Sequence, residues 1–239
     1  MRMGSIKKES GLKTKNTVKG LHPVLSGWID LVVSYSDSFK DDACYWYNER
    51  CTLSTLAGAA WRSHNWVALE EFSTQKASRK IDLEIGNAKN GRCDIKIASP
   101  STSFAIEVKQ AWQPVGSRVR DEFGYVTAAL KKAKNDAREL KREIASQRMA
   151  GVFVVPNIRT NEIEKKAASE GASADQACTE MIDAWCKRLV KKVNPNAYAY
   201  VFPKRTRLLS GWNGERIYPG VVFLLVMIPR GYGQVRGKT

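Results

Sequence analysis

Two carboxylates and a lysine lie close together in residues 92–112, which read RCDIKIASPSTSFAIEVKQAW. Alternating apolar and polar residues on both sides of the turn-forming segment 99–102 predict a β-hairpin. If this turn is centred between its second and third residues, Asp94 lies directly opposite Glu107, and Lys109 follows on the same face of its strand. Carboxylates opposed in this way are roughly 4.5–5.5 Å apart at Cβ and repel each other. A divalent cation bound between them would compensate this repulsion.

The spacing of these residues resembles that of the PD-(D/E)XK nuclease superfamily, in which an Asp on one strand precedes a Glu-x-Lys on the next. The matching residues are Asp94, Glu107 and Lys109, with Val108 between the last two and Cys93 where the family name has Pro. The resemblance implies that Asp94, Glu107 and the backbone carbonyl of Val108 bind Mg²⁺, for which Mn²⁺ can substitute. It also implies that Lys109 orients or deprotonates the attacking water, or neutralises charge on the phosphorane. A simple salt bridge from Lys109 to one of the two carboxylates is the alternative interpretation.

The elements that must position these residues are expected in the order helix, three strands, helix, strand. This is the α-β-β-β-α-β core of the same superfamily, and the resemblance covers about residues 41–156. It implies an α/β fold with a restriction-endonuclease-like mixed central sheet flanked by helices. The predicted helices are 41–62 and 122–148, and the strand candidates are 66–72, 80–85, 92–98, 103–112 and 152–155. Asn90-Gly91 is a predicted hairpin turn, and Pro156 is expected to end the last strand.

Glu49 falls within the apolar stripe of the first predicted helix, which is formed by Trp46, Leu53, Leu56, Ala57 and Ala60. A carboxylate on the buried side of a helix needs a partner. Either Glu49 pairs with a buried Arg or Tyr hydroxyl, or it points at the strand face that carries Asp94 and Glu107. The resemblance implies the second arrangement, because the family places an acidic residue on its first core helix. Glu49 is therefore a further candidate catalytic residue.

The rest of the chain is expected to extend this core. An amphipathic helix is predicted from Pro23 to the Ser-rich segment 34–38, another helix over 173–192, and strands around 198–202 and 221–228. The expected organisation is a mobile basic arm at 1–19, one nuclease-like domain at 20–229 with its core at about 41–156 and a C-terminal elaboration at 157–229, and a basic tail at 230–239.

The charge balance favours a polyanionic partner. Lys and Arg number 39 against 24 acidic residues, for a net charge of +15, which suits nucleic acid or an anionic surface, although the charge could also serve only solubility. Residues 187–207 contain no acid, and Lys191, Lys192, Lys204 and Arg205 within them are candidate phosphate contacts. Tyr198, Tyr200 and Phe202 share one strand face there, where they could stack bases or belong to the core.

Several other classes of protein are disfavoured. The five cysteines form no CxxC pair, which suggests free thiols in a reducing cytoplasm. The first residues lack the apolar segment of a secretory signal, and the longest apolar run, 221–228, is too short to span a bilayer. Only two histidines are present, and no GxxxxGK[ST] or GxGxxG motif occurs, which argues against Ser-His-Asp hydrolysis and nucleotide-driven chemistry.

The expected function is Mg²⁺-dependent hydrolysis of phosphodiester bonds in DNA by a cytoplasmic endonuclease of the restriction or defence type. Double-stranded DNA is the expected partner, and cutting of both strands would favour a homodimer. The alternative is a non-catalytic nucleic-acid-binding protein that keeps the same fold. The presence of Asp94, Glu107 and Lys109 together favours the enzyme.

Overall fold

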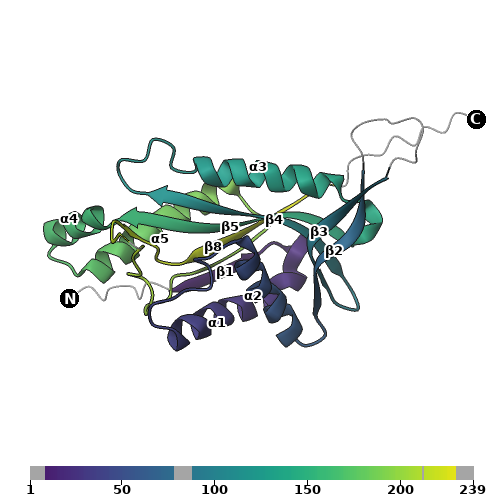
Figure 1. The fold of residues 1–239 in the computed structure, drawn as a ribbon, viewed down its shortest axis with the longest axis horizontal. Coiled ribbons are helices and arrows are strands. Elements are labelled where there is room, and N and C mark those ends of the chain that lie inside the picture. Colours follow the sequence, from purple (N-terminus) through teal and green to yellow (C-terminus); the bar gives the residue numbers. More distant parts are fainter. Residues whose placement is uncertain (1–8, 78–87, 212, 230–239) are drawn as a thin grey trace, which may run out of the picture.

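The computed structural model describes residues 9–77, 88–211 and 213–229 (Figure 1). Its helices are α1 (His22–Ser38), α2 (Glu49–Arg62), α3 (Gly124–Glu139), α4 (Thr160–Glu170) and α5 (Ala174–Val193), with 3₁₀ turns at Asn16–Leu21 and Arg142–Ile144. Its strands are β1 (Ser10–Thr14), β2 (Val67–Ala77), β3 (Ala88–Ala98), β4 (Ser103–Val115), β5 (Gln147–Arg159), β6 (Ala197–Val201), β7 (Arg216–Ile217) and β8 (Val221–Met227).

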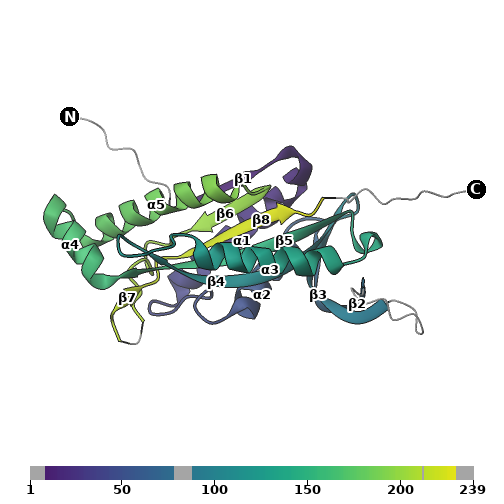
Figure 2. The same ribbon diagram turned by 90° about the horizontal axis from the view of Figure 1, so that it is seen from above.

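These strands form an open mixed sheet of eight strands in the order β1-β6-β8-β5-β4-β3-β2, with β7 also paired to β5. Strands β4 and β5 run parallel, and the other neighbours are antiparallel. Helices α1 and α2 cover one face of the sheet (Figure 1), and α3 and α5 run along the other face (Figure 2). The protein is therefore an α/β structure with a central sheet flanked by helices.

The central strand β5 shows why the sheet is covered on both faces. Phe153 and Val155 pack into the core beneath α1, whereas Val152 and Val154 pack into the core beneath α3 and α5. A strand buried on both faces reads as a continuous apolar run, so the strand predicted at 152–155 is confirmed. Pro156 does not end it, because this residue lies between the end of the β8 pairing and the start of the β7 pairing, where that edge of β5 has no partner strand.

Two predicted helix boundaries are wrong. Helix α2 begins at Glu49 rather than at 41–42, because the Asn48 side chain accepts a hydrogen bond from Cys51 N (3.0 Å) and caps the helix there. Helix α3 ends at Glu139 because Leu140 turns to an extended conformation and is buried in a small core cluster. Residues up to 148 are a 3₁₀ turn and the start of β5.

The predicted turn at Asn90-Gly91 is also wrong. Both residues lie inside β3, where they pair with Gln75 and Thr74 of β2. Pairing along a long strand has therefore overridden a strong local turn signal. The strand candidate 80–85 falls outside the described residues, while the predicted helices beginning at Pro23 and covering 173–192 are confirmed as α1 and α5.

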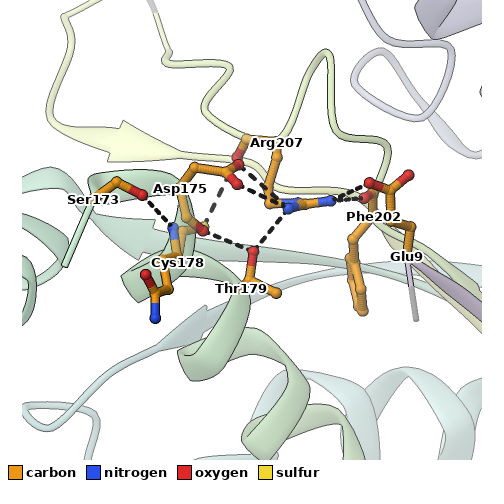
Figure 3. Close-up of polar contacts among 8 residues, drawn as sticks. Glu9, Ser173, Asp175, Cys178, Thr179, Phe202 and Arg207 are labelled. Carbon is orange, nitrogen blue, oxygen red and sulfur yellow. Dashed lines mark hydrogen bonds and ion pairs between the residues drawn. The ribbon is translucent and has the colours of Figure 1, made fainter. Parts of the chain in front are cut away.

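The predicted mobile arm at 1–19 is wrong from Ser10 onward, because β1 pairs with β6 at the edge of the sheet. Glu9, next to this strand, forms an ion pair with the buried Arg207 (3.2 Å). Figure 3 shows the Arg207 guanidinium between Glu9 and the start of α5, where it contacts Asp175 (3.2 Å) and Thr179 Oγ1 (2.8 Å). It also donates to the carbonyl of Phe202, just after β6 (3.1 Å). This arginine ties three distant segments together. Residues 1–8 and the predicted tail at 230–239 lie outside the described residues.

In the part of the chain that is described, every helix is too short or too polar to cross a membrane. The five cysteines are all free thiols, four of them buried, as the absence of paired spacing predicts.

Candidate active site

Strands β3 and β4 pair over a short stretch and then separate. Their register runs from Ala98 opposite Ser103 to Ile95 opposite Ile106, and this is the register predicted from the turn at 99–102. Beyond this point β4 continues beside β5, while β3 continues beside β2 and leaves the main sheet (Figure 1). The separation leaves one edge of β4 without a partner strand, and we call this place the fork.

Side chains take the place of the missing strand at the fork. Asp94 Oδ2 accepts a hydrogen bond from Val108 N (2.7 Å), and Glu49 Oε2 accepts one from Gln110 N (2.9 Å). Lys109 Nζ donates to the Val108 carbonyl (2.8 Å). Backbone N–H groups that lack a partner strand need other hydrogen-bond acceptors. Glu49, the first residue of α2, supplies one of them at the open edge of β4. The sequence-predicted residues Asp94, Lys109 and Glu49 are thus brought together.

Lys109 is the electrostatic centre of this group. Its Nζ lies 3.8 Å from Asp94 Oδ2 and 3.2 Å from Asp136 Oδ2 on α3. Burial alone would lower the lysine pKa, but Asp94, then Asp136 and Glu49, raise it above its ordinary value. Lys109 therefore keeps its proton at neutral pH. Asp136 is a site residue that sequence reasoning missed, because an acidic residue on a polar helix face carries no local signal of its partner.

The surroundings of Glu49 disfavour its charged form, whereas those of Lys109 favour the charged form. Burial raises the pKa of its carboxyl group, Lys109 opposes this effect, and the negative charge of Asp94 adds to it. Glu49 therefore lies within electrostatic range of both Asp94 and Lys109, on the side of the fork that faces α2. Of the two arrangements left open by the sequence, the structure has the one in which Glu49 points at the strands.

Glu107 is buried, with only 2% of its surface exposed. Its neighbours Ile106 and Val108 pack on the α1 and α2 side of the sheet, so Glu107 and Lys109 point to the face covered by α3. Burial, followed by the charges of Glu107 and Asp94, raises the pKa of the Cys93 thiol to about 12. Cys93, where the superfamily name has Pro, is thus a protonated thiol beside the two carboxylates.

The carboxylates are not gathered into a ready-made metal centre. Within residues 9–77, 88–211 and 213–229, no three His, Cys, Asp or Glu side chains are grouped closely enough to hold a metal ion. Instead, two oxygen atoms approach one positive charge: Asp94 Oδ2 and the Val108 carbonyl oxygen both lie close to Lys109 Nζ. Carboxylate and carbonyl oxygens are also the donors that Mg²⁺ prefers.

The four candidate phosphate contacts do not form one surface. Lys191 and Lys192 lie in the last turn of α5, whereas Lys204 and Arg205 follow β6 and lie close to the other end of that helix, where Arg207 contacts Asp175. A helix of this length separates its ends by roughly 30 Å. The acid-free run is therefore split into two basic patches.

The aromatic residues of β6 and the adjacent Phe202 pack against the core. The rings of Tyr198, Tyr200 and Phe202 stack in succession, with centroids 6.5 and 5.4 Å apart. They pack against the apolar cluster beneath α3 and α5, and Phe202 is 4% exposed. Of the two interpretations of these residues, packing rather than base stacking describes their surroundings.

The fold and the site thus define an α/β protein with an open mixed sheet and a lysine–carboxylate cluster where two strands separate. No family model, curated protein or solved structure matches the chain.

Proposed function

We propose that the protein is a Mg²⁺-dependent endonuclease that hydrolyses phosphodiester bonds in DNA, with the fork as its active site. The observation that carries the proposal is that Asp94, Lys109 and Glu49 meet there, with Glu107 on the same strand face. The element order α2-β2-β3-β4-α3-β5, with β5 parallel to β4, supports a restriction-endonuclease-like core. The net charge of +15 supports double-stranded DNA as the substrate.

The donor set at the fork fits a divalent cation in its chemistry. The residues that would hold Mg²⁺, or Mn²⁺ in its place, are Asp94, Glu107 and the carbonyl of Val108. Two of these donors already face a positive charge, the Lys109 ammonium, at 3.8 and 2.8 Å. A bound Mg²⁺ would supply polarisation of the phosphate and a lower pKa for a bound water.

The protein's own groups have separate roles. Because its pKa is raised, Lys109 serves as a fixed positive charge that orients water and stabilises the phosphorane, rather than as a base. Asp136, 3.2 Å from Lys109 Nζ, positions the ammonium. The Val108 N–H orients Asp94 through a hydrogen bond of 2.7 Å. The site thus holds a positive charge and carboxylate oxygens in fixed relative positions.

A nicking assay on supercoiled plasmid tests the proposal directly. We expect cleavage with Mg²⁺ or Mn²⁺ and none with a chelator, and the Asp94→Asn/Glu107→Gln double variant, purified in parallel, controls for contaminating nuclease. Equal cleavage by this double variant would contradict the proposal. Tight DNA binding without cleavage under any divalent metal would favour the alternative, a non-catalytic nucleic-acid-binding protein. Cytoplasmic action against foreign DNA, and a homodimer for cutting both strands, belong to the same proposal.

Glu49→Gln separates a catalytic from a structural role for Glu49. The amide keeps an acceptor for Gln110 N, so we expect the melting temperature to stay within about 2 °C of wild type, while Mg²⁺-dependent cleavage falls about 10²-fold or more. Normal cleavage per folded molecule would return Glu49 to a structural role.

The pH dependence of stability gives a second readout for the same variant. A carboxyl group whose pKa is raised by folding stabilises the folded protein most below its unfolded pKa. This stabilisation is lost as pH rises through the pKa of the folded state. The stability of Glu49→Gln relative to wild type should therefore increase as pH rises through that range. Urea unfolding at a series of pH values measures it.

The salt dependence of DNA binding tests the two basic patches. Neutralising Lys191, Lys192, Lys204 and Arg205 together should reduce the log–log salt slope by about 0.9 for each phosphate that the protein no longer neutralises. Because the patches lie at opposite ends of α5, the two paired variants will show which one contacts DNA. The matched control replaces Lys187 and Arg188, which are already paired with Asp183 and Glu122. An unchanged slope in the fourfold variant would exclude both patches.

A further inference from the structure

A cavity of about 600 Å³ opens where β4 and β5 end, beyond the candidate active site. These strands are the parallel pair of the sheet, and in open α/β sheets ligands bind outside the carboxyl ends of such strands. The volume lies in the range of small-molecule sites. Val115, which lines the cavity, is roughly 20 Å along β4 from Lys109 at about 3.3 Å per residue. The cavity is therefore separate from the fork.

Arginine dominates the charge of the lining. Four arginines contribute, Arg118 and Arg120 from the segment between β4 and α3, Arg159 from the end of β5, and Arg216 from β7; the acids are Asp121 and Glu162. Segments distant in the sequence thus bring guanidinium groups to one hollow. Guanidinium groups are the side chains best suited to bind phosphate oxygens in pairs.

The two acids of the lining are engaged by the backbone. Glu162 Oε2 accepts a hydrogen bond from Ser117 N (3.0 Å), and Asp121 Oδ1 accepts one from Phe123 N (3.1 Å). Glu164 and Glu215 line a neighbouring hollow with two of the arginines. No carboxylate of the described residues forms an ion pair with any of the four arginines. The lining of the cavity therefore carries four positive charges against two negative ones, an excess of positive charge that suits an anion.

Two of these arginines also oppose each other directly. Arg159 and Arg216 are paired in the antiparallel β5–β7 ladder, and like charges at such positions destabilise a sheet. Arg216 is held in place by the largely buried Asn157, whose Oδ1 accepts its hydrogen bond (2.5 Å). An anion bound between these two arginines would offset the repulsion of their charges. This pairing is a second observation, independent of the cavity, that points to an anionic ligand.

An aromatic ring at the cavity narrows the class of anion. Tyr125, in the first turn of α3, lines the hollow and is 63% exposed. An exposed tyrosine beside arginines offers a stacking surface next to a phosphate site. We propose that this cavity binds a nucleotide unit, with its phosphate on the arginines and its base on Tyr125. The ligand is either a free nucleotide or the phosphorylated end of a nucleic-acid strand, and the proposal does not depend on nuclease activity.

Isothermal titration calorimetry in chelator tests the proposal without cleavage. The probes are a nucleoside 5′-monophosphate, a short single-stranded oligonucleotide with a 5′-phosphate, and the same oligonucleotide without it. Saturable binding of the monophosphate identifies a free nucleotide, and binding only of the phosphorylated oligonucleotide identifies a strand end. Arg159→Gln should weaken binding of the preferred probe about tenfold or more, because a charge-assisted hydrogen bond to the phosphate is removed. Arg62→Gln, an exposed arginine at the end of α2, is the matched control and should bind as wild type.

Two further variants keep the test decisive. Tyr125→Leu should weaken binding of the nucleoside monophosphate while leaving binding of ribose 5-phosphate unchanged, because only the base is stacked. Arg118→Gln changes an arginine in a loop and should also lower affinity for the preferred probe about tenfold or more. It tests the proposal independently if Arg159→Gln does not fold. Relief of the Arg159–Arg216 repulsion should leave the unliganded Arg159→Gln variant no less stable than wild type. Absence of saturable binding by all probes, or equal loss in Arg62→Gln, would overturn the proposal.

Discussion

We expect Asp94→Asn, Glu107→Gln and Lys109→Met each to reduce Mg²⁺-dependent DNA cleavage by about 10³-fold or more, the largest effect on activity that the structure predicts. The first two changes remove a charge that would hold the metal ion, and the third removes the positive charge that faces the phosphate. Asn at position 94 keeps an acceptor for Val108 N, so the hydrogen bond that closes the open edge of β4 survives. Loss of activity in this variant would therefore report on charge.

The three variants should differ in how they bind the metal. Asp94→Asn and Glu107→Gln should weaken Mg²⁺ or Mn²⁺ binding measured by calorimetry. Lys109→Met should retain or strengthen it, because an ammonium that now occupies the approach to Asp94 and the Val108 carbonyl is gone. Asp183→Asn, a surface carboxylate on α5 paired with Lys187, is the control and should cleave normally. Full activity of folded Glu107→Gln at saturating Mg²⁺ would refute the metal-site assignment.

Arg207→Met should cause the largest loss of stability, about 3 kcal/mol in the free energy of unfolding. The side chain of Arg207 is only 6% exposed, and the variant leaves the Phe202 carbonyl and Thr179 without its hydrogen bonds. The estimate lies at the low end for a broken buried pair because Glu9 and Asp175 are partly exposed and can be rehydrated. Urea unfolding followed by circular dichroism measures the loss.

Arg207→Lys should recover part of this stability. Lysine keeps the charge, but it cannot reach the two carboxylates and the Phe202 carbonyl with a planar fork. Arg205→Met, two residues away and exposed, is the control and should change stability by less than about 0.5 kcal/mol. If Arg207→Met proved as stable as Arg205→Met, the interactions in Figure 3 would not hold the N-terminal strand to α5.

Much of the candidate site follows from short-range patterns. The turn at 99–102 and the alternation of apolar residues set the register of β3 and β4, which places Asp94, Glu107 and Lys109 on one strand face. The apolar stripe of α2 likewise indicated that Glu49 points inward. These features depend on residues a few positions apart, and side-chain periodicity and turn chemistry act over that range.

Other features of the site required the tertiary structure. The fork exists because β3 follows β2 for eleven residues and leaves β4, and the same pairing keeps Asn90-Gly91 extended against its local preference. Asp136 reaches Lys109 from α3, and Arg159 meets Arg216 across the β5–β7 ladder.

Local sequence patterns were therefore sufficient for the strand register, the strand face of the candidate site and most helices. Tertiary packing was needed to establish where strands separate, where α3 ends and which distant charges meet. The physical reason is that these outcomes depend on contacts between segments far apart in the chain, whose free energy outweighs the small preferences of local turns and caps.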